Sequence, residues 1–73
     1  MSTIDVRAEM PGTIATIDCS PGQRVDQDAT LLAIESMKME YPVVAPRAGA
    51  VARIAVAVGD VVDEGALLLT LEP

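Results

Sequence analysis

The chain has 73 residues, of which 51% are hydrophobic, a composition that excludes a disordered chain. Its formal net charge is −6, and with five basic residues and a single aromatic residue it lacks the basic stripe and the stacking platform of a nucleic-acid-binding protein. The length predicts one domain over residues 1–73, too small for an elaborate catalytic cleft.

Short apolar segments separated by turn residues predict strands along most of the chain. In chain order the expected strands cover residues 13–18, 24–26, 30–35, 40–45, 50–56, 61–63 and 67–71. Turn residues lie between them, as in Ser20-Pro21-Gly22 and Val58-Gly59-Asp60. This spacing is typical of an all-β sandwich or flattened barrel of about eight short strands.

The chain resembles itself when it is shifted by 37 positions. Identical residues meet in the pairs Gly12/Gly49, Ala15/Ala52, Ile17/Ile54, Gly22/Gly59, Val25/Val62, Asp26/Asp63, Ala29/Ala66, Leu31/Leu68, Leu32/Leu69 and Glu35/Glu72. Coincidence is the alternative in a chain rich in small aliphatic residues, but the paired glycines and acids argue against it. We interpret 12–35 and 49–72 as two copies of one unit that close a shared core with quasi-twofold symmetry. The glycines at equivalent positions should then share backbone conformations.

The segment from Ala29 to Glu40 is ambiguous on its own. It is rich in good helix formers, and Leu31, Ile34 and Met37 recur at every third position, as on a helix face. Its counterpart in the second copy, 66–71, is too short for a helix. Since tertiary context often overrides intrinsic propensity, we interpret the segment as strand.

Lys38 is the one lysine of the chain, and it lies in the connection between the two copies. Met37 and Met39 flank it at what we expect to be an exposed hairpin tip. The plain interpretation is a solvated surface lysine with two methionines that dip into the core, and residue types alone favour it. The alternative is modification, because a lysine amine is a nucleophile that forms a stable amide once acylated.

Other kinds of site find little support in the sequence. Cys19 is the single cysteine and histidine is absent, so there is no internal disulfide and no zinc ligand set. Residues 1–10 lack the apolar segment of a secretory signal, and no run approaches the roughly 18 apolar residues of a membrane span. We expect a cytoplasmic, acidic domain that is monomeric in isolation, with no metal, membrane or nucleic-acid partner.

The run Glu35-Ser36-Met37-Lys38-Met39-Glu40 resembles the biotin-attachment signature, Glu-Ala/Ser-Met-Lys-Met, of biotinyl domains, the biotin carboxyl carrier domains of biotin-dependent carboxylases. The resemblance covers nearly the whole chain. Residues 10–14 are similar to the start of the family pattern, 43–51 to its I-x-A-P-x-x-G-x-V stretch, and 58–62 with 65–68 to its ending. A lone Met-Lys-Met would be a weak signal, but in this register it is specific.

The resemblance implies a flattened antiparallel β-barrel of two four-stranded sheets, the biotinyl/lipoyl-like fold. It implies that a biotin protein ligase attaches biotin covalently to Lys38 and reads Glu35, Met37, Met39 and Glu40 around it. The domain would be a small, stand-alone, non-catalytic carrier that moves a carboxyl group between the biotin carboxylase and carboxyltransferase subunits of a biotin-dependent carboxylase, with an acyl-CoA as the expected acceptor. The protruding thumb loop of some members is not expected, because 19–23 has the composition of a plain turn.

Two rival functions and one unusual residue stay open at this point. The lipoyl family usually has Asp-Lys-Ala around its lysine, a pattern that Met37 and Met39 replace, although small members with this motif resemble attachment proteins for both biotin and lipoate. A regulatory module that is never modified would have no reason to expose two methionines. Tyr41 stands where the family more often has an aliphatic or small polar residue; we favour a role in filling the core over a role in covering the base of the arm.

Overall fold

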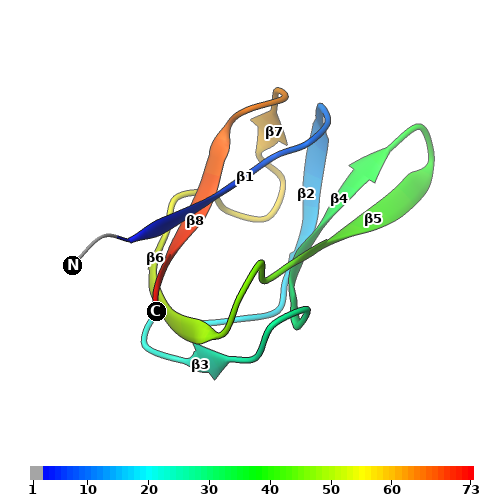
Figure 1. Ribbon diagram of the computed structural model, residues 1–73. Helices are drawn as coiled ribbons and strands as arrows, with labels where there is room; N and C mark the ends of the chain where they lie inside the picture. Colours follow the sequence, from blue (N-terminus) through cyan, green and yellow to red (C-terminus); the bar gives the residue numbers. More distant parts are fainter. Residues whose placement is uncertain (1–2) are drawn as a thin grey trace.

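Eight antiparallel strands in two four-stranded sheets make up the computed structural model, which describes residues 3–73 (Figure 1). The strands are β1 (Ile4–Arg7), β2 (Gly12–Ile17), β3 (Arg24–Val25), β4 (Thr30–Ser36), β5 (Met39–Val44), β6 (Gly49–Ile54), β7 (Val61–Val62) and β8 (Leu67–Glu72). One sheet has the order β1-β8-β6-β3 and the other β5-β4-β2-β7. The predicted all-β fold of two four-stranded sheets is confirmed. Within residues 3–73, nothing helical is long and apolar enough to cross a membrane.

The ambiguous segment is a strand, as the comparison of the two copies predicted. Residues Thr30–Ser36 form β4, which pairs with β2 on one side and β5 on the other. Four consecutive side chains of this strand, from Leu31 to Ile34, are buried. Hydrogen-bonded neighbours on both edges, together with this burial, outweigh the small helix preference of the individual residues.

β1 is absent from the predicted strands. It has only four residues, two of them charged, and Val6 is its one buried residue. The shift by 37 positions carries a signal for it, because Val6 meets Val43 and Ala8 meets Ala45. The sequence comparison placed the start of the first copy at Gly12, but the internal similarity begins upstream of this residue.

The two halves of the chain are interlocked rather than side by side. A shift by 37 positions takes β1, β2, β3 and β4 to β5, β6, β7 and β8, and each sheet contains two strands from each half. Backbone hydrogen bonds outside the ladders recur at equivalent places. The Asp18 N–H donates to the Leu31 carbonyl oxygen at 2.8 Å, and the Ala55 N–H donates to the Leu68 carbonyl oxygen at the same distance. Each half by itself supplies one strand pair, β2–β4 or β6–β8, and strands of the other half complete each four-stranded sheet.

The turns of the two halves also correspond. Gly22 and Gly59 have φ angles of 88° and 95°, so the expected equivalence of this pair is confirmed. Asp28, with a φ of 71°, stands where the second half has Gly65 at 88°. The connection after β2 closes tightly, with a hydrogen bond of 3.1 Å from the Gln23 N–H to the Ser20 carbonyl oxygen.

The core between the sheets is aliphatic, and the inner strands supply it. The largest fully buried side chains come from β2, β4, β6 and β8: Ile14, Leu31, Leu32, Ile34, Val51, Leu68, Leu69 and Leu71. Burial of each such side chain stabilises the fold by about 1.5–3 kcal/mol. These four strands are the central pair of each sheet, so the core joins the sheets along their middle.

Gly12 and Gly49 lie at equivalent points where two strands approach closely. A Cβ on Gly12 would lie 2.5 Å from the Glu35 carbonyl oxygen, and a Cβ on Gly49 would lie 2.5 Å from the Glu72 carbonyl oxygen. Glu35 and Glu72 are themselves related by the shift of 37. The same steric constraint, which excludes a Cβ, therefore applies at both glycines, as the sequence comparison predicted.

We predict that Gly12→Ala lowers the free energy of unfolding by about 1–3 kcal/mol, because the new methyl group forces Glu35 and Ile34 away from their positions. For a domain of this size each kcal/mol lowers Tm by about 4–8 °C. Thermal unfolding followed by circular dichroism measures the change. Thr16→Ser, an exposed change on the same strand, is the control and should leave Tm close to that of the wild type. Equal Tm values for the two variants would contradict the close approach.

Candidate functional site

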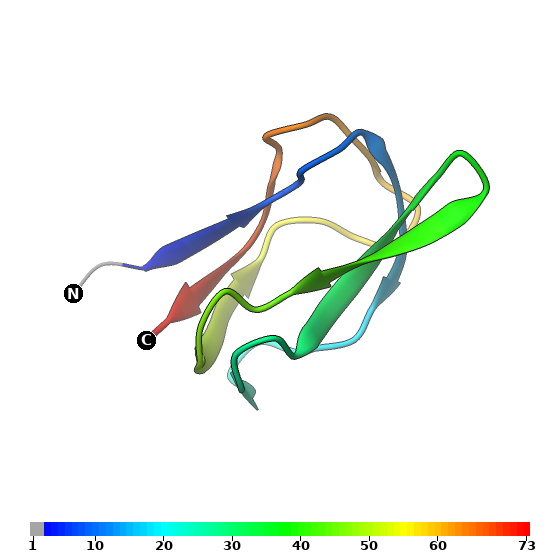
Figure 2. The ribbon, with the colours of Figure 1, turned by 45° about the vertical axis from the view of Figure 1, so that its right-hand side comes forward.

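Lys38 lies at the tip of the hairpin between β4 and β5. Ser36 and Met39 are register partners at its base, so Met37 and Lys38 alone form the turn. The hairpin projects at the end of the molecule opposite to the N- and C-termini, as both ribbon views show (Figure 2). Lys38 is exposed. The expected exposed hairpin is therefore present, with the lysine at its apex.

The turn has a conformation that its residues do not favour. Met37 and Lys38 have φ angles of 53° and 68°, in the left-handed region. Two-residue hairpin turns of type I′ need positive φ at both central positions and usually contain Asn-Gly. A residue with a Cβ costs roughly 1–2 kcal/mol in this region. The paired strands on either side impose the conformation, and strain of this kind concentrates at functional sites.

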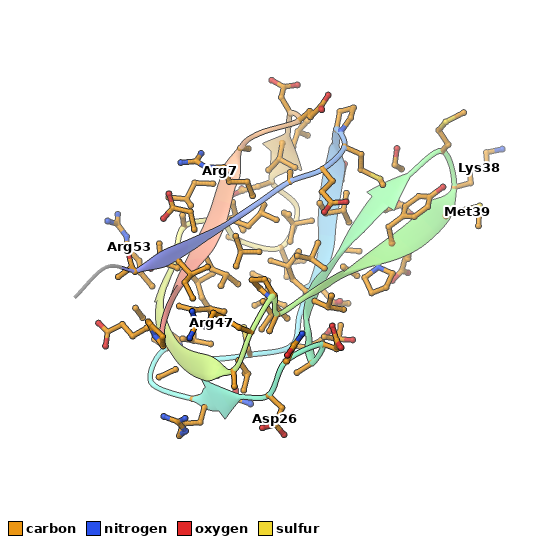
Figure 3. All side chains as sticks on the ribbon, viewed as in Figure 1. Arg7, Asp26, Lys38, Met39, Arg47 and Arg53 are labelled. Atoms are coloured by element: carbon orange, nitrogen blue, oxygen red, sulfur yellow. The ribbon has the colours of Figure 1, made fainter. Side chains whose placement is uncertain are left out.

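The two methionines next to Lys38 point into solvent. Met37 is 91% exposed and Met39 is 60% exposed. The interpretation in which they dip into the core is therefore wrong. In the stick view the labelled Met39 and Lys38 side chains extend outward from the hairpin (Figure 3). Exposed apolar side chains of this size carry no packing role, which leaves them available for contact with another molecule.

Two acidic residues lie directly below the turn. Glu35 and Glu40 are register partners across β4 and β5, and both are exposed. Like charges at opposed positions of a sheet are destabilising, so folding does not explain the pair. Among residues 3–73 the one ion pair within 4 Å joins Arg7 and Asp5, so no carboxylate there pairs with the Lys38 amine. The hairpin thus combines a free amine at its apex with two carboxylates below the turn.

Tyr41 covers the base of the hairpin on the side that faces the other sheet. It is half-buried, is the register partner of Ile34, and is absent from the buried core. Its hydroxyl donates to the Met39 Sδ at 3.8 Å. The favoured interpretation of Tyr41 as a core-filling residue is wrong. On β5, an end strand of its sheet, the ring lines the surface between β5 and β1 and does not join the core.

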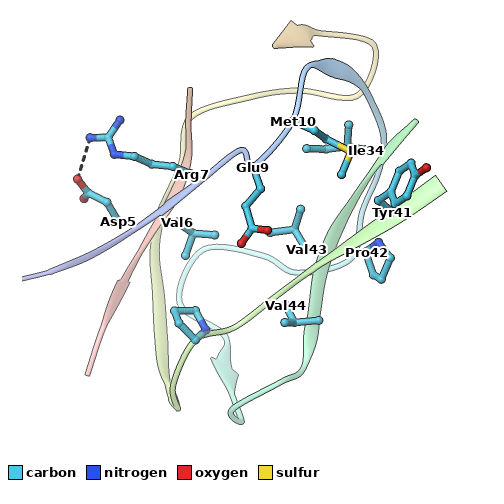
Figure 4. Close-up of a pocket in the computed structure, with 11 residues that line it drawn as sticks. Asp5, Val6, Arg7, Glu9, Met10, Ile34, Tyr41, Pro42, Val43 and Val44 are labelled. Atoms are coloured by element: carbon cyan, nitrogen blue, oxygen red, sulfur yellow. Dashed lines mark hydrogen bonds and ion pairs between the residues drawn. The ribbon is translucent and has the colours of Figure 1, made fainter. Parts of the chain in front are cut away.

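A groove of about 320 Å³ runs between β1 and β5, the end strands of the two sheets (Figure 4). Its lining is mostly apolar, with Met10, Ile34 and Tyr41 at the end near the hairpin. Arg7 borders it but is engaged, because its guanidinium donates to Asp5 and to the Gly65 carbonyl oxygen at 3.0 Å each. Sequence reasoning did not find this groove, since it depends on which strands end the two sheets.

The part of the chain that the structure describes offers neither a metal centre nor a reactive thiol. No three His, Cys, Asp or Glu side chains of residues 3–73 come together as metal ligands. Cys19 is a free, buried cysteine, and burial, with a smaller contribution from the charge of Asp18, raises the pKa of its thiol. A higher pKa keeps the thiol protonated and unreactive at neutral pH. The Lys38 amine is the nucleophile that the fold presents at an accessible tip.

Comparisons with known proteins agree with this geometry. A family model described as "Biotin-requiring enzyme" matches residues 3–71. The biotinylated protein TB7.3 homologue of Mycobacterium leprae is 40% identical over 67 residues, which cover 92% of this chain and 94% of that protein.

Two solved structures show the same fold. A single-chain, multi-domain long-chain acyl-CoA carboxylase superposes with a TM-score of 0.89 at 32% identity, over 93% of this chain and 7% of that one. The lipoyl domain of the 2-oxoglutarate dehydrogenase complex from Azotobacter vinelandii superposes with a TM-score of 0.82 at 34% identity, over 96% of both chains. The chain thus corresponds to a small part of the carboxylase and to nearly all of the lipoyl domain.

The strained turn yields a stability prediction. Met37→Asn should raise the free energy of unfolding by about 1 kcal/mol, because asparagine tolerates the left-handed region that Met37 occupies. Chemical denaturation measures the gain. Met39→Asn is the matched control, since Met39 lies in β5, where asparagine is unfavourable and no gain is expected. A Met37→Asn variant no more stable than the wild type would show that the turn is not strained at this position.

Proposed function

Since the chain belongs to the biotin/lipoyl attachment family, as a non-catalytic biotin carrier domain of biotin-dependent carboxylases, we propose that it holds its biotin on Lys38 and carries a carboxyl group between two active sites. The observation that supports this residue most strongly is its place at the apex of a two-residue turn, exposed and free of ion pairs with residues 3–73. No second lysine competes for the modification.

The tip suits an attachment residue on physical grounds. An acylating enzyme must bring the amine into its own active site, and a lysine at a projecting apex can enter such a site without unfolding of the domain. The amine must give up a proton before it acts as a nucleophile, so the ligase must take up this proton. The amine nitrogen then forms an amide bond with the activated carboxyl carbon of biotin, and the activating group leaves with the electron pair of the broken bond.

The side chains around Lys38 have separate roles in this proposal. Met37 and Met39 are flexible thioethers that adapt to the surface of a ligase, which explains their exposure. Glu35 and Glu40 place negative charge at the foot of the hairpin, which selects a ligase surface of opposite charge. This role accounts for the unfavourable pairing of two like charges across the strands. None of these four residues belongs to the core, so recognition is separated from folding.

The carrier function follows from tethering. Biotin, when bound, supplies a ureido nitrogen that accepts and releases a carboxyl group. Lys38 contributes a flexible stem of four carbons, while the paired strands β4 and β5 keep its base fixed. Both active sites then meet the bound group at roughly millimolar effective concentration without its release into solution. The partners are therefore a biotin protein ligase and the carboxylase and carboxyltransferase sites.

An acyl-CoA is the proposed acceptor of the carboxyl group, which the likeness to the long-chain acyl-CoA carboxylase supports. Lipoate on Lys38 is the alternative, and the likeness to the Azotobacter vinelandii lipoyl domain favours it. The resemblance of the flanking residues distinguishes the two, since Met37 and Met39 are similar to the biotinyl pattern and depart from the lipoyl one.

Lys38→Arg should abolish biotin attachment and leave the fold intact, because the guanidinium stays protonated and is a poor nucleophile. The experiment incubates each protein with an active biotin ligase, ATP and biotin, and records the intact mass. The wild type should gain the mass of one biotin and bind streptavidin, and the variant should do neither at an unchanged Tm. Modified Lys38→Arg protein, or unmodified wild type, would refute the assignment.

The double change Met37→Asp with Met39→Ala should shift attachment from biotin toward lipoate, because it converts both flanks to the lipoyl pattern and leaves the core untouched. Rates of modification by a biotin ligase and by a lipoate ligase, measured by mass spectrometry, report the change. Arg53→Gln, an exposed change on the side of the domain away from Lys38 (Figure 3), is a control that should modify at the wild-type rate. Biotinylation of the double variant at the original rate would mean that the ligase does not read the methionines.

A further inference from the structure

The groove between β1 and β5 opens beside the hairpin that carries Lys38. Its near end is lined by Met10, Ile34 and Tyr41, and its far end by residues that include Val44 and Pro46. β1 and β5 end different sheets, so the seam between them lies where the ladders stop. Figure 4 shows the Tyr41 ring at one end and the Glu9 side chain extending into the space between the two strands. Nothing in the proposed attachment chemistry uses this groove.

Tyr41 is larger than the fold requires at its position. The shift by 37 relates it to Ile4, and the two occupy equivalent places: Ile4 is the register partner of Leu71, and Tyr41 is the register partner of Ile34. Ile4 packs against the core as an aliphatic side chain. The sole aromatic residue of the chain therefore replaces an aliphatic one at the third register pair from the attachment tip. The aromatic ring there gives the groove an apolar surface that packing of the core does not require.

The near end of the groove is within reach of a group tethered to Lys38. Tyr41 lies three positions along β5, a distance of about 10 Å. The four-carbon lysine stem and the acyl chain of biotin together extend on the order of 10 Å before the ring system begins. Val44 lies six positions from Lys38, about 20 Å along the strand, and is beyond this reach.

We propose that the biotin on Lys38 folds back into the near end of the groove, with its ring system packed on Tyr41 and Met10. This inference rests on the proposed attachment at Lys38. The Tyr41 ring and the Met10 thioether suit the sulfur-containing ring of biotin. An aromatic ring makes favourable contacts with sulfur, both that of biotin and that of the methionine. The Glu9 carboxylate, which lies in the groove, is an acceptor for a ureido N–H.

The tether makes such a contact effective although each interaction is weak. A group held on a short flexible arm meets the groove at roughly millimolar effective concentration. The arm then exchanges between a docked state and a free state, and a partner captures only the free fraction. A docked arm keeps its ring out of solvent between visits to the active sites, while rapid exchange leaves delivery possible.

The first measurement separates this inference from the function on which it rests. Wild type, Tyr41→Ile and Val44→Ala are biotinylated to completion, and intact mass verifies one biotin on each. Tyr41→Ile installs the side chain type found at the equivalent Ile4, so the fold is retained. Absence of the added mass from the wild type would overturn both the attachment at Lys38 and the folded-back arm.

The second measurement tests the groove alone. Amide NMR spectra of the unmodified and biotinylated wild type should differ at Met10 and Ile34, which lie outside the hairpin turn, as well as at 36–40. These additional shifts should be lost in Tyr41→Ile and kept in Val44→Ala. Stopped-flow capture by streptavidin should be about two- to fivefold slower for the wild type and Val44→Ala than for Tyr41→Ile, since docking lowers the free fraction. Shifts confined to 36–40, or equal capture rates in all three proteins, would overturn the proposal and leave the attachment intact.

Discussion

The aliphatic core closes only when both halves of the chain contribute to both sheets. Each sheet holds two strands from each half, and the largest fully buried side chains come from the central strands β2, β4, β6 and β8. A chain of this length buries only about 60% of its unfolded surface, so two independent cores are out of reach and the halves must share one. The same sharing makes β4 and β5 neighbours in one sheet, which leaves two residues, Met37 and Lys38, for the connection between the halves. The geometry of the tip that carries Lys38 is thus a consequence of how the core is built.

The site lies where the internal symmetry is broken. The strand pair equivalent to β4 and β5 is β8 and β1, and Figure 1 shows the ends of the chain there instead of a turn. The domain therefore has one tip, with the termini at the opposite end. Arg7, Arg47 and Arg53 lie on the side away from Lys38, whereas Glu35 and Glu40 lie under the turn (Figure 3). Near-identical backbones in the two halves thus support two ends with different chemistry.

Sequence reasoning predicted the features that depend on local pattern and on the internal similarity. The similarity identified 30–35 as strand against its helix-forming composition, and it predicted the equivalence of the glycines. The similarity also extends to β1, because Val6 and Ala8 have identical counterparts in the second half. So short a strand can be identified only once its partner β8 is known. The exposure of the tip followed from its place between the halves. The groove and the position of Tyr41 could not be predicted, because both depend on which strands end each sheet, and this is a property of long-range pairing that no local pattern encodes.

The fold by itself does not select the cofactor. A carboxylase domain and a lipoyl domain superpose on this chain with TM-scores of 0.89 and 0.82, so the same backbone serves proteins of both kinds. Selection must then come from side chains that can vary without a cost to the core. Met37 and Met39 meet this condition because they are largely exposed, whereas Gly12 and the buried leucines do not, since any change there disturbs the packing between strands. The division is physical: residues packed between the strands fix the position of the lysine, whereas exposed residues outside the core can vary without disturbing it.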